Sequence, residues 1–484
     1  MAVASKKVTI PCSSYNNSLE TSTDINITLE YTDVVGVAGG ANGISITDFT
    51  DTIVNNDTTI SLIIPKSFDG KNIIGIGDGA FSDFTNLESI ILPESLTSIG
   101  KSAFYGCTKL KFISNKLLYE CDNLGLTTLP KGLESIGEGA FKECTSLVSI
   151  ILPDSITSIG VYAFINCTSL VSITLPINLK SIDYAAFRGC ASLVSIILPE
   201  SLESIGDSAF YECSSLVSIT LPDGLKTIGS GAFFKCTSLK LTTLPKSLDS
   251  IGESAFNGCT SLALTTLPIN LKSIGINAFA GCTSLVLTIL PDSLETIGNT
   301  AFYGCTSLVS ITLPNNLKSI RGYTFYGCAS LESIILPKGL ESIHESAFNG
   351  CTKLELITLP ASIKSIGNSA FNGCTKLALT ELPNGITSIG VDAFNGCDSL
   401  SPAIIIQITN LQSGGSMAKK TTYNNKKTTY NNKKTTYNNK KTTYNKKKTS
   451  NKKSAYTYNK KKTTYNNKKT INNKKKTSNK KNVK

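Results

Sequence analysis

The 484-residue chain contains no tryptophan, a single histidine and only two arginines. One histidine excludes sites that need two or more imidazoles, such as histidine dyads and multi-histidine metal centres. No apolar run approaches the roughly 18–20 residues that span a bilayer, and the first residues lack the apolar segment of a secretory signal. There is no phosphate-cradling glycine loop, no zinc-ligand spacing and no isolated carboxylate pair. The sequence therefore predicts a protein that is not an enzyme and holds no cofactor or metal.

Acidic and basic side chains are unevenly divided along the chain. The net charge is +12, but residues 418–484 hold 24 lysines and no acidic residue. Residues 1–417 hold 23 basic and 35 acidic side chains, a net charge of −12. The chain is thus an acidic body followed by a basic tail, and not a uniformly basic protein.

A repeat of 23 residues dominates the acidic body. Phenylalanine occurs fourteen times at this spacing between Phe81 and Phe394, and a cysteine follows nearly every one by three residues. The spacing is broken once, where Phe104 and Phe141 are 37 residues apart. Residues 118–121 begin 14 residues after Phe104 and resemble the Phe-x-x-Cys segment. We therefore predict fifteen coils, one of which lacks nine residues, with a bulge or kink at the truncation.

Each repeat predicts one coil of a solenoid. A single unit is too small to bury its apolar residues, whereas stacked units align each apolar position into a continuous internal column. The Leu-x-x-Ile-x-Leu segment predicts a short parallel strand, the Leu-x-Ser-Ile segment a second extended run, and the Ala-Phe-x-x-Cys segment one helical or 3₁₀ turn. A glycine after each Ser-Ile pair is expected to supply the bend before that turn. The structural ladder includes Phe141, Phe164, Phe187, Cys144, Cys167 and Cys190.

The residue before each Ser-Ile or Thr-Ile pair tests this stacking, because its charge alternates from coil to coil. In a parallel stack these side chains are neighbours about 4.8 Å apart, so opposite charges attract and like charges repel. The pattern favours the solenoid, although duplication of a 46-residue unit also explains it. The alternating residues are Lys180, Glu203, Lys226, Asp249, Lys272, Glu295, Lys318, Glu341 and Lys364.

The repeat L-x-x-I-G-x-x-A-F-x-G-C-x-x-L-x-x-I-x-L-P resembles that of the BspA-like leucine-rich repeat family. Residues 43–47 and the segment from Ile64 to Lys71 resemble the first, capping unit of that family. The resemblance implies a leucine-rich-repeat solenoid, α/β and horseshoe-like in type but built mostly of short parallel β-strands with 3₁₀ or helical turns. Such proteins are mostly surface or secreted adhesion and interaction modules, so the resemblance implies binding to other proteins.

The fifteen cysteines invite a disulfide or metal interpretation, but thirteen stand in one column of the repeat and no Cys-x-x-Cys pair occurs. Phe84 stands in the same column in the first coil, and a position that accepts Phe is an apolar core position. Buried free cysteine behaves as a small hydrophobic residue. We therefore predict a ladder of reduced, buried thiols, which favours an intracellular compartment.

The outward positions of the Leu-x-x-Ile-x-Leu strand form a nearly uncharged strip of Val, Ser, Thr and Ile. Leucine-rich repeats often bind through this surface, so we predict a partner face here. Recent duplication without selection for a ligand explains the strip equally well. The candidate residues are Val148, Val171, Val194, Val217, Ile151, Thr174, Ile197 and Thr220.

Two departures from the repeat leave alternatives open. In some coils the Ser-Ile order of this strand changes to Leu-Thr, beginning at Leu241, which would turn either a Leu outward or a Thr inward. The glycine column is interrupted at Asp183, Arg321 and His344. The last two stand in adjacent coils, so they are either a local recognition spot or drift at an exposed bend.

The basic tail repeats Thr-Thr-Tyr-Asn-Asn-Lys-Lys with a period of seven. Asn and Thr are poor helix formers and the lysines repel one another, so we predict disorder. Lysine neutralises phosphates and tyrosine stacks on unpaired bases, so the tail is a candidate for non-specific binding of RNA, DNA or another polyanion. A low-complexity expansion that binds nothing is the alternative. The candidate residues are Tyr423, Tyr430, Tyr437, Tyr444, Lys426, Lys427, Lys433 and Lys434.

The first functional hypothesis is a non-enzymatic scaffold that binds an unidentified protein through the solenoid faces and carries a flexible polycationic arm. The second is a polyanion binder acting through the tail, and the third is a surface adhesin exported without a visible signal. We expect an intracellular location, with a cell or particle surface as the alternative that the family implies. The predicted boundaries are residues 1–42 for a lead-in and candidate β cap, 43–413 for the solenoid with a capping first coil and a truncated coil near 107–121, 414–417 for a linker, and 418–484 for the tail.

Overall fold

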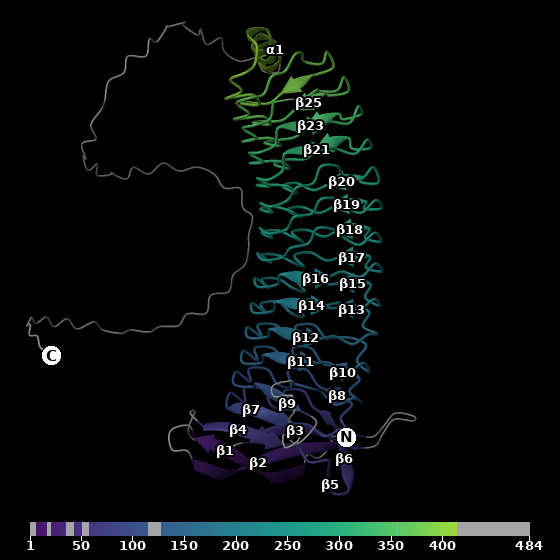
Figure 1. Ribbon diagram of the computed structural model, residues 1–484, viewed down its shortest axis with the longest axis vertical. Helices are drawn as coiled ribbons and strands as arrows, with labels where there is room; N and C mark the ends of the chain where they lie inside the picture. The colour runs from purple at the N-terminus through teal and green to yellow at the C-terminus, as the bar shows by residue number, and fades with distance from the viewer. Residues whose placement is uncertain are drawn as a thin grey trace, which may run out of the picture. The chain divides into compact units, whose positions relative to one another are not determined.

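The computed structural model describes residues 6–16, 21–34, 43–50, 58–114, 127–355 and 357–413. Over these residues the repeat forms a solenoid whose coils stack one upon the next, which confirms the predicted leucine-rich-repeat architecture (Figure 1). Each coil has three sides. The strand face carries the Leu-x-x-Ile-x-Leu segments, the Ser-Ile face carries the Ser-Ile or Thr-Ile pairs, and the turn edge carries the Ala-Phe-x-x-Cys segments.

Short parallel strands line two of these sides, because β-branched residues alternate there between core and solvent. The strands of the strand face are β7 (Leu87–Ile91), β9 (Phe112–Ser114), β11 (Ser149–Ile151), β12 (Ser172–Thr174), β14 (Ser195–Ile197), β16 (Ser218–Thr220), β21 (Ser310–Thr312) and β23 (Ser333–Ile335). Those of the Ser-Ile face are β6 (Lys71–Ile76), β8 (Ser98–Ile99), β10 (Ser135–Ile136), β13 (Ser181–Ile182), β15 (Ser204–Ile205), β17 (Thr227–Ile228), β18 (Ser250–Ile251), β19 (Ser273–Ile274), β20 (Thr296–Ile297), β22 (Ser319–Ile320), β24 (Ser342–Ile343), β25 (Ser365–Ile366) and β26 (Ser388–Ile389).

Four longer strands close the first end of the stack. They are β1 (Lys6–Asn16), β2 (Thr21–Val34), β3 (Gly43–Thr50) and β4 (Thr58–Ile63), and a short strand β5 (Ser67–Phe68) pairs with β6. The order β3-β2-β1-β4 is antiparallel, while β3 pairs in parallel with β6 and β4 in parallel with β7. One sheet thus passes from the Ser-Ile face across the end to the strand face, so the first strands of both faces are paired.

Helix α1 (Pro402–Ser413) covers part of the other end (Figure 1). Its Ile404 and Ile408 are buried against the last coil, and the Gln412 side chain donates a hydrogen bond to the Gly390 carbonyl at 2.7 Å. The Ser401 hydroxyl accepts from the Ile404 amide at 3.4 Å at the start of the helix. Its outer face leaves Ile405 and Ile406 exposed.

A continuous ladder of phenylalanine rings fills the core beside the turn edge. Rings in successive coils are stacked with centroids 5.2–5.6 Å apart, from Phe81 to Phe394. Offset stacking at such distances is favourable beyond the burial of area. The rings of Phe141, Phe164 and Phe187 are fully buried in this ladder, as predicted.

The break in the repeat adds a rung to the strand face alone. Phe104 stacks directly on Phe141 at 5.4 Å, and β8 pairs directly with β10. On the strand face, however, the Thr128 amide donates to the Ile113 carbonyl at 2.9 Å and the Ile151 amide to the Thr127 carbonyl at 2.7 Å. The turn edge therefore has fourteen phenylalanine rungs where we predicted fifteen coils. Residues 118–121, on which that count rested, lie outside the described residues.

The turn edge is built from overlapping β-turns, which corrects the predicted helical or 3₁₀ turn. In the coil of Phe141, amides of Ala140, Lys142 and Cys144 close turns onto the residue three before each. The intervening amides of Gly139, Phe141 and Glu143 donate to carbonyls of the next coil. The backbone has positive φ at Gly139 (60°) and Glu143 (61°), which no helical turn has.

The glycine that follows each Ser-Ile pair is explained by close packing and not by the bend we predicted. The backbone at Gly137 and Gly252 does not have a positive φ, so neither position needs the conformational freedom of glycine. A Cβ at Gly137 would lie 2.5 Å from the Gly100 carbonyl carbon, and one at Gly252 would lie 2.6 Å from that of Gly229. At Gly137 and Gly252 the neighbouring coil therefore leaves no room for a side chain.

Candidate partner-binding face

The strand face presents flat, nearly uncharged rungs in exact parallel register. β11 pairs with β12 so that Ser149 faces Ser172 and Ile151 faces Thr174, and β14 pairs with β16 in the same way. In each strand the central Ile points into the core and its two neighbours point outward. The sequence pattern therefore folds into a surface whose columns run along the stack.

Seven of the eight predicted face residues are exposed, and Ile151 is half-buried. The valines are 37–49% exposed, and Ile197 is 78% exposed. Because these are β-branched side chains on adjacent strands, they form a contiguous apolar strip with methyl groups and hydroxyls but no charge. The residues brought together are Val148, Val171, Val194, Val217, Ile151, Thr174, Ile197 and Thr220. Their role in binding stays a prediction.

The Leu-Thr coils divide this face, and they follow neither arrangement predicted from the sequence. Leu241, Leu264 and Leu287 all point into the core, while the threonine after each is exposed. The hydrogen bonds between these coils shift by one residue, since the Ala263 amide donates to the Leu241 carbonyl at 3.2 Å where the Val171 amide donates to the Val148 carbonyl. Within the described chain no strand lies between β16 and β21 on the strand face. The face therefore consists of two short strand patches separated by a threonine-rich segment.

A shallow groove of about 430 Å³ lies in the last coils of the strand face. Ile335, Ile357 and Ala378 line it. The column that holds Val171 elsewhere holds Glu332 and Glu355 here, and Lys353 lies 3.8 Å from Glu332. With Lys338 also lining the groove, this end of the face carries charges of both signs, unlike the valine strip.

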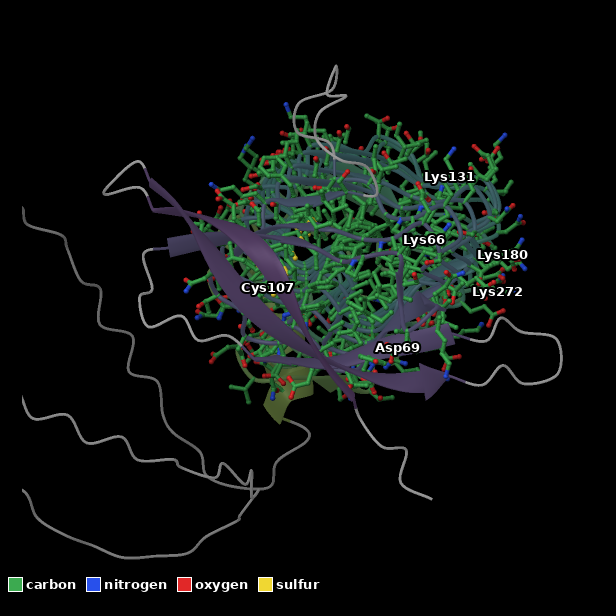
Figure 2. All side chains as sticks on the ribbon, turned by 90° about the horizontal axis from the view of Figure 1, so that it is seen from below. Lys66, Asp69, Cys107, Lys131, Lys180 and Lys272 are labelled. Carbon is green, nitrogen blue, oxygen red and sulfur yellow. The ribbon has the colours of Figure 1, made fainter. Side chains whose placement is uncertain are left out.

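Most alternating charges lie on the Ser-Ile side of the coils, away from the valine strip. Glu203 accepts from Lys226 at 2.7 Å and lies 4.0 Å from Lys180, and Lys364 donates to Glu341 at 2.6 Å. The Lys226 ammonium lowers the pKa of the Glu203 carboxyl, mainly by hydrogen bonding and then by charge. Figure 2, seen from the cap end, shows Lys131, Lys180 and Lys272 on one side of the stack. Ion pairs join four of the eight neighbouring pairs in this series of described residues, so opposite charges do lie side by side in adjacent coils, as predicted, but they do not form a continuous ladder.

The cysteine column is the thiol ladder that we predicted. All thirteen cysteines among the described side chains are free and buried. Each donates from Sγ to the carbonyl of the phenylalanine one coil earlier, as in Cys167 to Phe141 at 3.0 Å and Cys190 to Phe164 at 3.2 Å. Burial raises the pKa of the Cys144, Cys167 and Cys190 thiols well above the ordinary value. These groups are neutral structural donors and not nucleophiles.

An aromatic and cationic row on the turn edge was missed by the sequence analysis. The Arg188 guanidinium lies 4.4 Å from the ring centroid of Tyr211, Tyr211 stacks on Phe234 at 4.5 Å, and Lys235 lies 5.3 Å from the Phe234 ring. The one sequence feature that could have indicated this row is the 23-residue spacing of Arg188, Tyr211 and Phe234. Because the ring faces cover one another, the row stabilises the stack and leaves no open aromatic platform.

Two of the three substitutions in the glycine column, Arg321 and His344, lie in different surroundings. Arg321 is exposed at the rim of a shallow recess of about 400 Å³ on the Ser-Ile face, and β20 and β22 belong to separate sheets where it enters. His344 approaches the Ser342 hydroxyl at 3.3 Å, and Tyr323 donates to Glu345 at 3.0 Å. The structure does not join Arg321 and His344 in one recess, so the recognition spot stays a hypothesis.

Other predicted features fall outside what the structure describes. Tyr423, Tyr430, Tyr437, Tyr444, Lys426, Lys427, Lys433 and Lys434 all lie in residues 414–484, beyond the described residues. Among the side chains that are described, no group of three or more His, Cys, Asp and Glu residues is placed to hold a metal ion. Over the same part of the chain, none of the helices has the length and apolar character to cross a membrane.

The comparison with protein families decides the affiliation. The family described as BspA type Leucine rich repeat region (6 copies) matches residues 55–116, 111–240, 180–309 and 295–418. The chain belongs to the BspA-type leucine-rich repeat family. The resemblance seen in the repeat is thereby confirmed, and BspA-type repeats are typically interaction or surface scaffolds. No curated protein matches this BspA-type chain.

Three solved structures are similar to this chain over about three quarters of its length. A leucine-rich repeat protein from Bacteroides ovatus is 29% identical over 76% of this chain and 91% of its own, with a TM-score of 0.52. A leucine rich cell surface protein from Faecalibacterium prausnitzii is 24% identical over 77% and 92%, with a TM-score of 0.38. The pneumococcal vaccine antigen PcpA is 21% identical over 75% and 96%, with a TM-score of 0.44.

Proposed function

We propose that this protein is a non-enzymatic scaffold that binds another protein through its strand face. The observation that carries the proposal is the run of exposed Val148, Val171, Val194 and Val217, each directly before one of four neighbouring strands and with uncharged neighbours. Contiguous apolar surface of this kind on a soluble solenoid marks an interaction site. Stacked repeats build an extended surface on which each coil contributes a small share of the binding energy.

The strand face is favoured over the other two sides on physical grounds. The Ser-Ile side presents exposed ion pairs such as Lys226–Glu203. A partner that covers such a pair removes its hydration and gains little binding free energy, because exposed ion pairs are weak. On the turn edge, aromatic groups such as Tyr211 and Phe234 are already stacked on each other. The valine strip is the side that gains most from being covered.

A pair of matched double variants tests the proposal. Val171→Lys with Val194→Lys places two charges on the strip, whereas Ile177→Lys with Ile269→Lys changes apolar residues that are still more exposed, in the turns that follow the strand-face segments. Tagged full-length proteins are expressed in the native cell, and co-purifying proteins are quantified after nuclease treatment. The amount of each partner that co-purifies with the wild type and with the turn variant should be at least tenfold lower with the strand-face variant. An unchanged set of partners, or equal losses from both variants, would overturn the proposal.

A further inference from the structure

Backbone hydrogen bonds along the turn edge all run in one direction. In each coil three alternate amides donate to carbonyls of the following coil, as in Phe348 to Ala370 and Phe371 to Ala393, both at 2.7 Å. The flanking amides of the last such pair follow the same rule, Ser369 to Val391 at 2.9 Å and Gly373 to Asn395 at 2.8 Å. The carbonyls of the last coil are thus used, while its corresponding amides face the end of the stack.

Three amides therefore form an open donor row at the end of the solenoid. They belong to Asp392, Phe394 and Gly396, and among the described residues no backbone or side-chain group accepts from them. The backbone has positive φ at Asp392 (56°) and Gly396 (72°), the same alternation that aims the amides of earlier coils at their acceptors. The three amides occupy the same alternate positions from which earlier coils donate to the coil that follows them.

A pocket of about 470 Å³ opens over this row. Its floor is apolar, with Phe394, Cys397 and Leu400 from the last coil, and Ile408 and Thr409 of α1 form a wall. Phe394 is 9% exposed, whereas every earlier ring of the ladder is fully buried. Burial raises the pKa of Cys397 to about 12, so its thiol adds no charge. Helix α1 thus leaves part of the ladder open, and the volume suits a side chain with its backbone.

We propose that this pocket binds a segment of a partner protein that adopts the turn conformation of the repeat and carries an Ala-Phe pair flanked by lysine or arginine. The segment takes the place of a following coil, its alternate carbonyls accept from the three open amides, and its phenylalanine stacks on Phe394. Asp392 and Asp398 line the same pocket, so basic flanks are favoured. The site is separate from the strand face and does not depend on the function proposed above.

The same features exclude two other occupants. An inorganic anion would accept from the amides but would lie against Asp392 and Asp398. A second copy placed end to end in a symmetric dimer would set donors of one row against identical donors of the other, since both rows consist of amides. A peptide carbonyl with cationic residues beside it accepts from the amides and is not repelled by the two carboxylates.

The test uses the full chain and a capped synthetic peptide, Lys-Ser-Ala-Phe-Asn-Gly-Lys, with a fluorophore at one end. Thr409→Trp fills the pocket from the exposed side of α1, and Gln407→Trp adds the same ring to the helix outside the pocket. A second peptide has Asn in place of Phe. Fluorescence anisotropy should give saturable binding, weakened at least tenfold by Thr409→Trp and by the Asn peptide, and unchanged by Gln407→Trp.

Asp398→Lys gives an independent measurement that leaves the buried ladder intact, because Asp398 is exposed. It should weaken binding of the phenylalanine peptide severalfold at low salt and much less at high salt. Absence of saturable binding to the wild type at millimolar peptide would overturn the proposal. So would equal affinities for the two peptides, or equal losses from Thr409→Trp and Gln407→Trp.

Discussion

The thiol of Cys259 donates a hydrogen bond of 2.9 Å to the carbonyl oxygen of Phe233 in the preceding coil. The same bond joins Cys236 to Phe210 and Cys282 to Phe256, both at 3.1 Å. Sulfur and ring thus alternate up the core, and the carbonyl that receives the thiol lies beyond the reach of water. A thiolate has no proton to donate and loses hydration on burial, so the fold requires neutral thiols.

The first prediction is a steep loss of stability in alkali. The folded pKa of these thiols is raised, to about 12 for Cys328, above an unfolded value of about 8.5. Their stabilisation is therefore complete below pH 8.5 and is lost as pH rises toward the folded pKa. Each thiol costs about 1.4 kcal/mol per pH unit in that window. Denaturant unfolding at pH 7.5 and 9.5 measures the loss.

The control for the alkaline experiment is a variant with Cys167→Ala, Cys190→Ala and Cys213→Ala. This variant is less stable at pH 7.5 because it loses buried atoms and hydrogen bonds. The slope of its unfolding free energy against pH should be smaller than that of the wild type, in proportion to the three thiols removed out of thirteen. An identical pH slope for the wild type and this variant would contradict a thiol origin for the effect.

The second prediction concerns thiol reactivity. Cys12 and Cys121 are not among the thirteen described thiols of the column, so both are replaced by serine and only the column thiols remain. Because burial suppresses thiolate formation, this protein should react negligibly with a chromogenic disulfide reagent at pH 7.5 and release thirteen equivalents in denaturant. Cys397, next to the open end, should react first under mild denaturation. Rapid native reaction of several equivalents would contradict the packing described above.

The third prediction separates close packing from backbone conformation at glycine. Gly252→Ala places a Cβ 2.6 Å from the Gly229 carbonyl carbon, so two coils must move apart, at a cost of about 1–3 kcal/mol. Gly224→Ala is the matched control, since its nearest neighbour atom is 3.6 Å away. Urea unfolding should show a large loss for the first and a change within about 0.5 kcal/mol for the second.

The fourth prediction concerns strain at the turn edge. Thr300 is β-branched and has φ of 57°, where the equivalent residues Gly79 and Gly139 have 64° and 60°. Thr300→Gly relieves a left-handed conformation and should stabilise by about 0.5–1 kcal/mol net of the glycine entropy cost. Thr306→Gly, at a residue without positive φ, should destabilise by about 0.5–1 kcal/mol. A loss of stability in both variants would refute the strain argument.

The sequence was sufficient for everything that depends on period and burial. The spacing of Phe141 and Phe164 placed the ring ladder, and Phe84 in the cysteine column identified that column as core, because one fixed unit stacked on itself admits few arrangements. The alternation of Lys226 and Glu203 likewise required adjacent coils in register. The outward position of Thr174 between the buried Ile173 and Leu175 followed from the two-residue period of a strand.

Backbone detail was not predictable in the same way. The Leu241-Thr242 order gives an outward Leu only if the strand stays extended, and the backbone changed instead so that Leu241 stays buried. The glycine column depends on how closely neighbouring coils approach, since a Cβ at Gly137 or Gly252 would lie 2.5–2.6 Å from a backbone atom of the previous coil, and the repeat spacing does not record this. The amides of Asp392 and Gly396 are open because turn-edge amides donate to the following coil. The amino-acid sequence does not indicate in which direction these hydrogen bonds run.

Photo-cross-linking from the three sides of the solenoid tests most directly whether the strand face is the binding surface. A photoreactive amino acid is introduced singly at Val194 on the strand face, Glu203 on the Ser-Ile side and Arg188 on the turn edge, and living cells are irradiated. The account predicts a discrete protein adduct from Val194 and none of comparable yield from Glu203 or Arg188. Adducts from Glu203 or Arg188 with none from Val194 would contradict it.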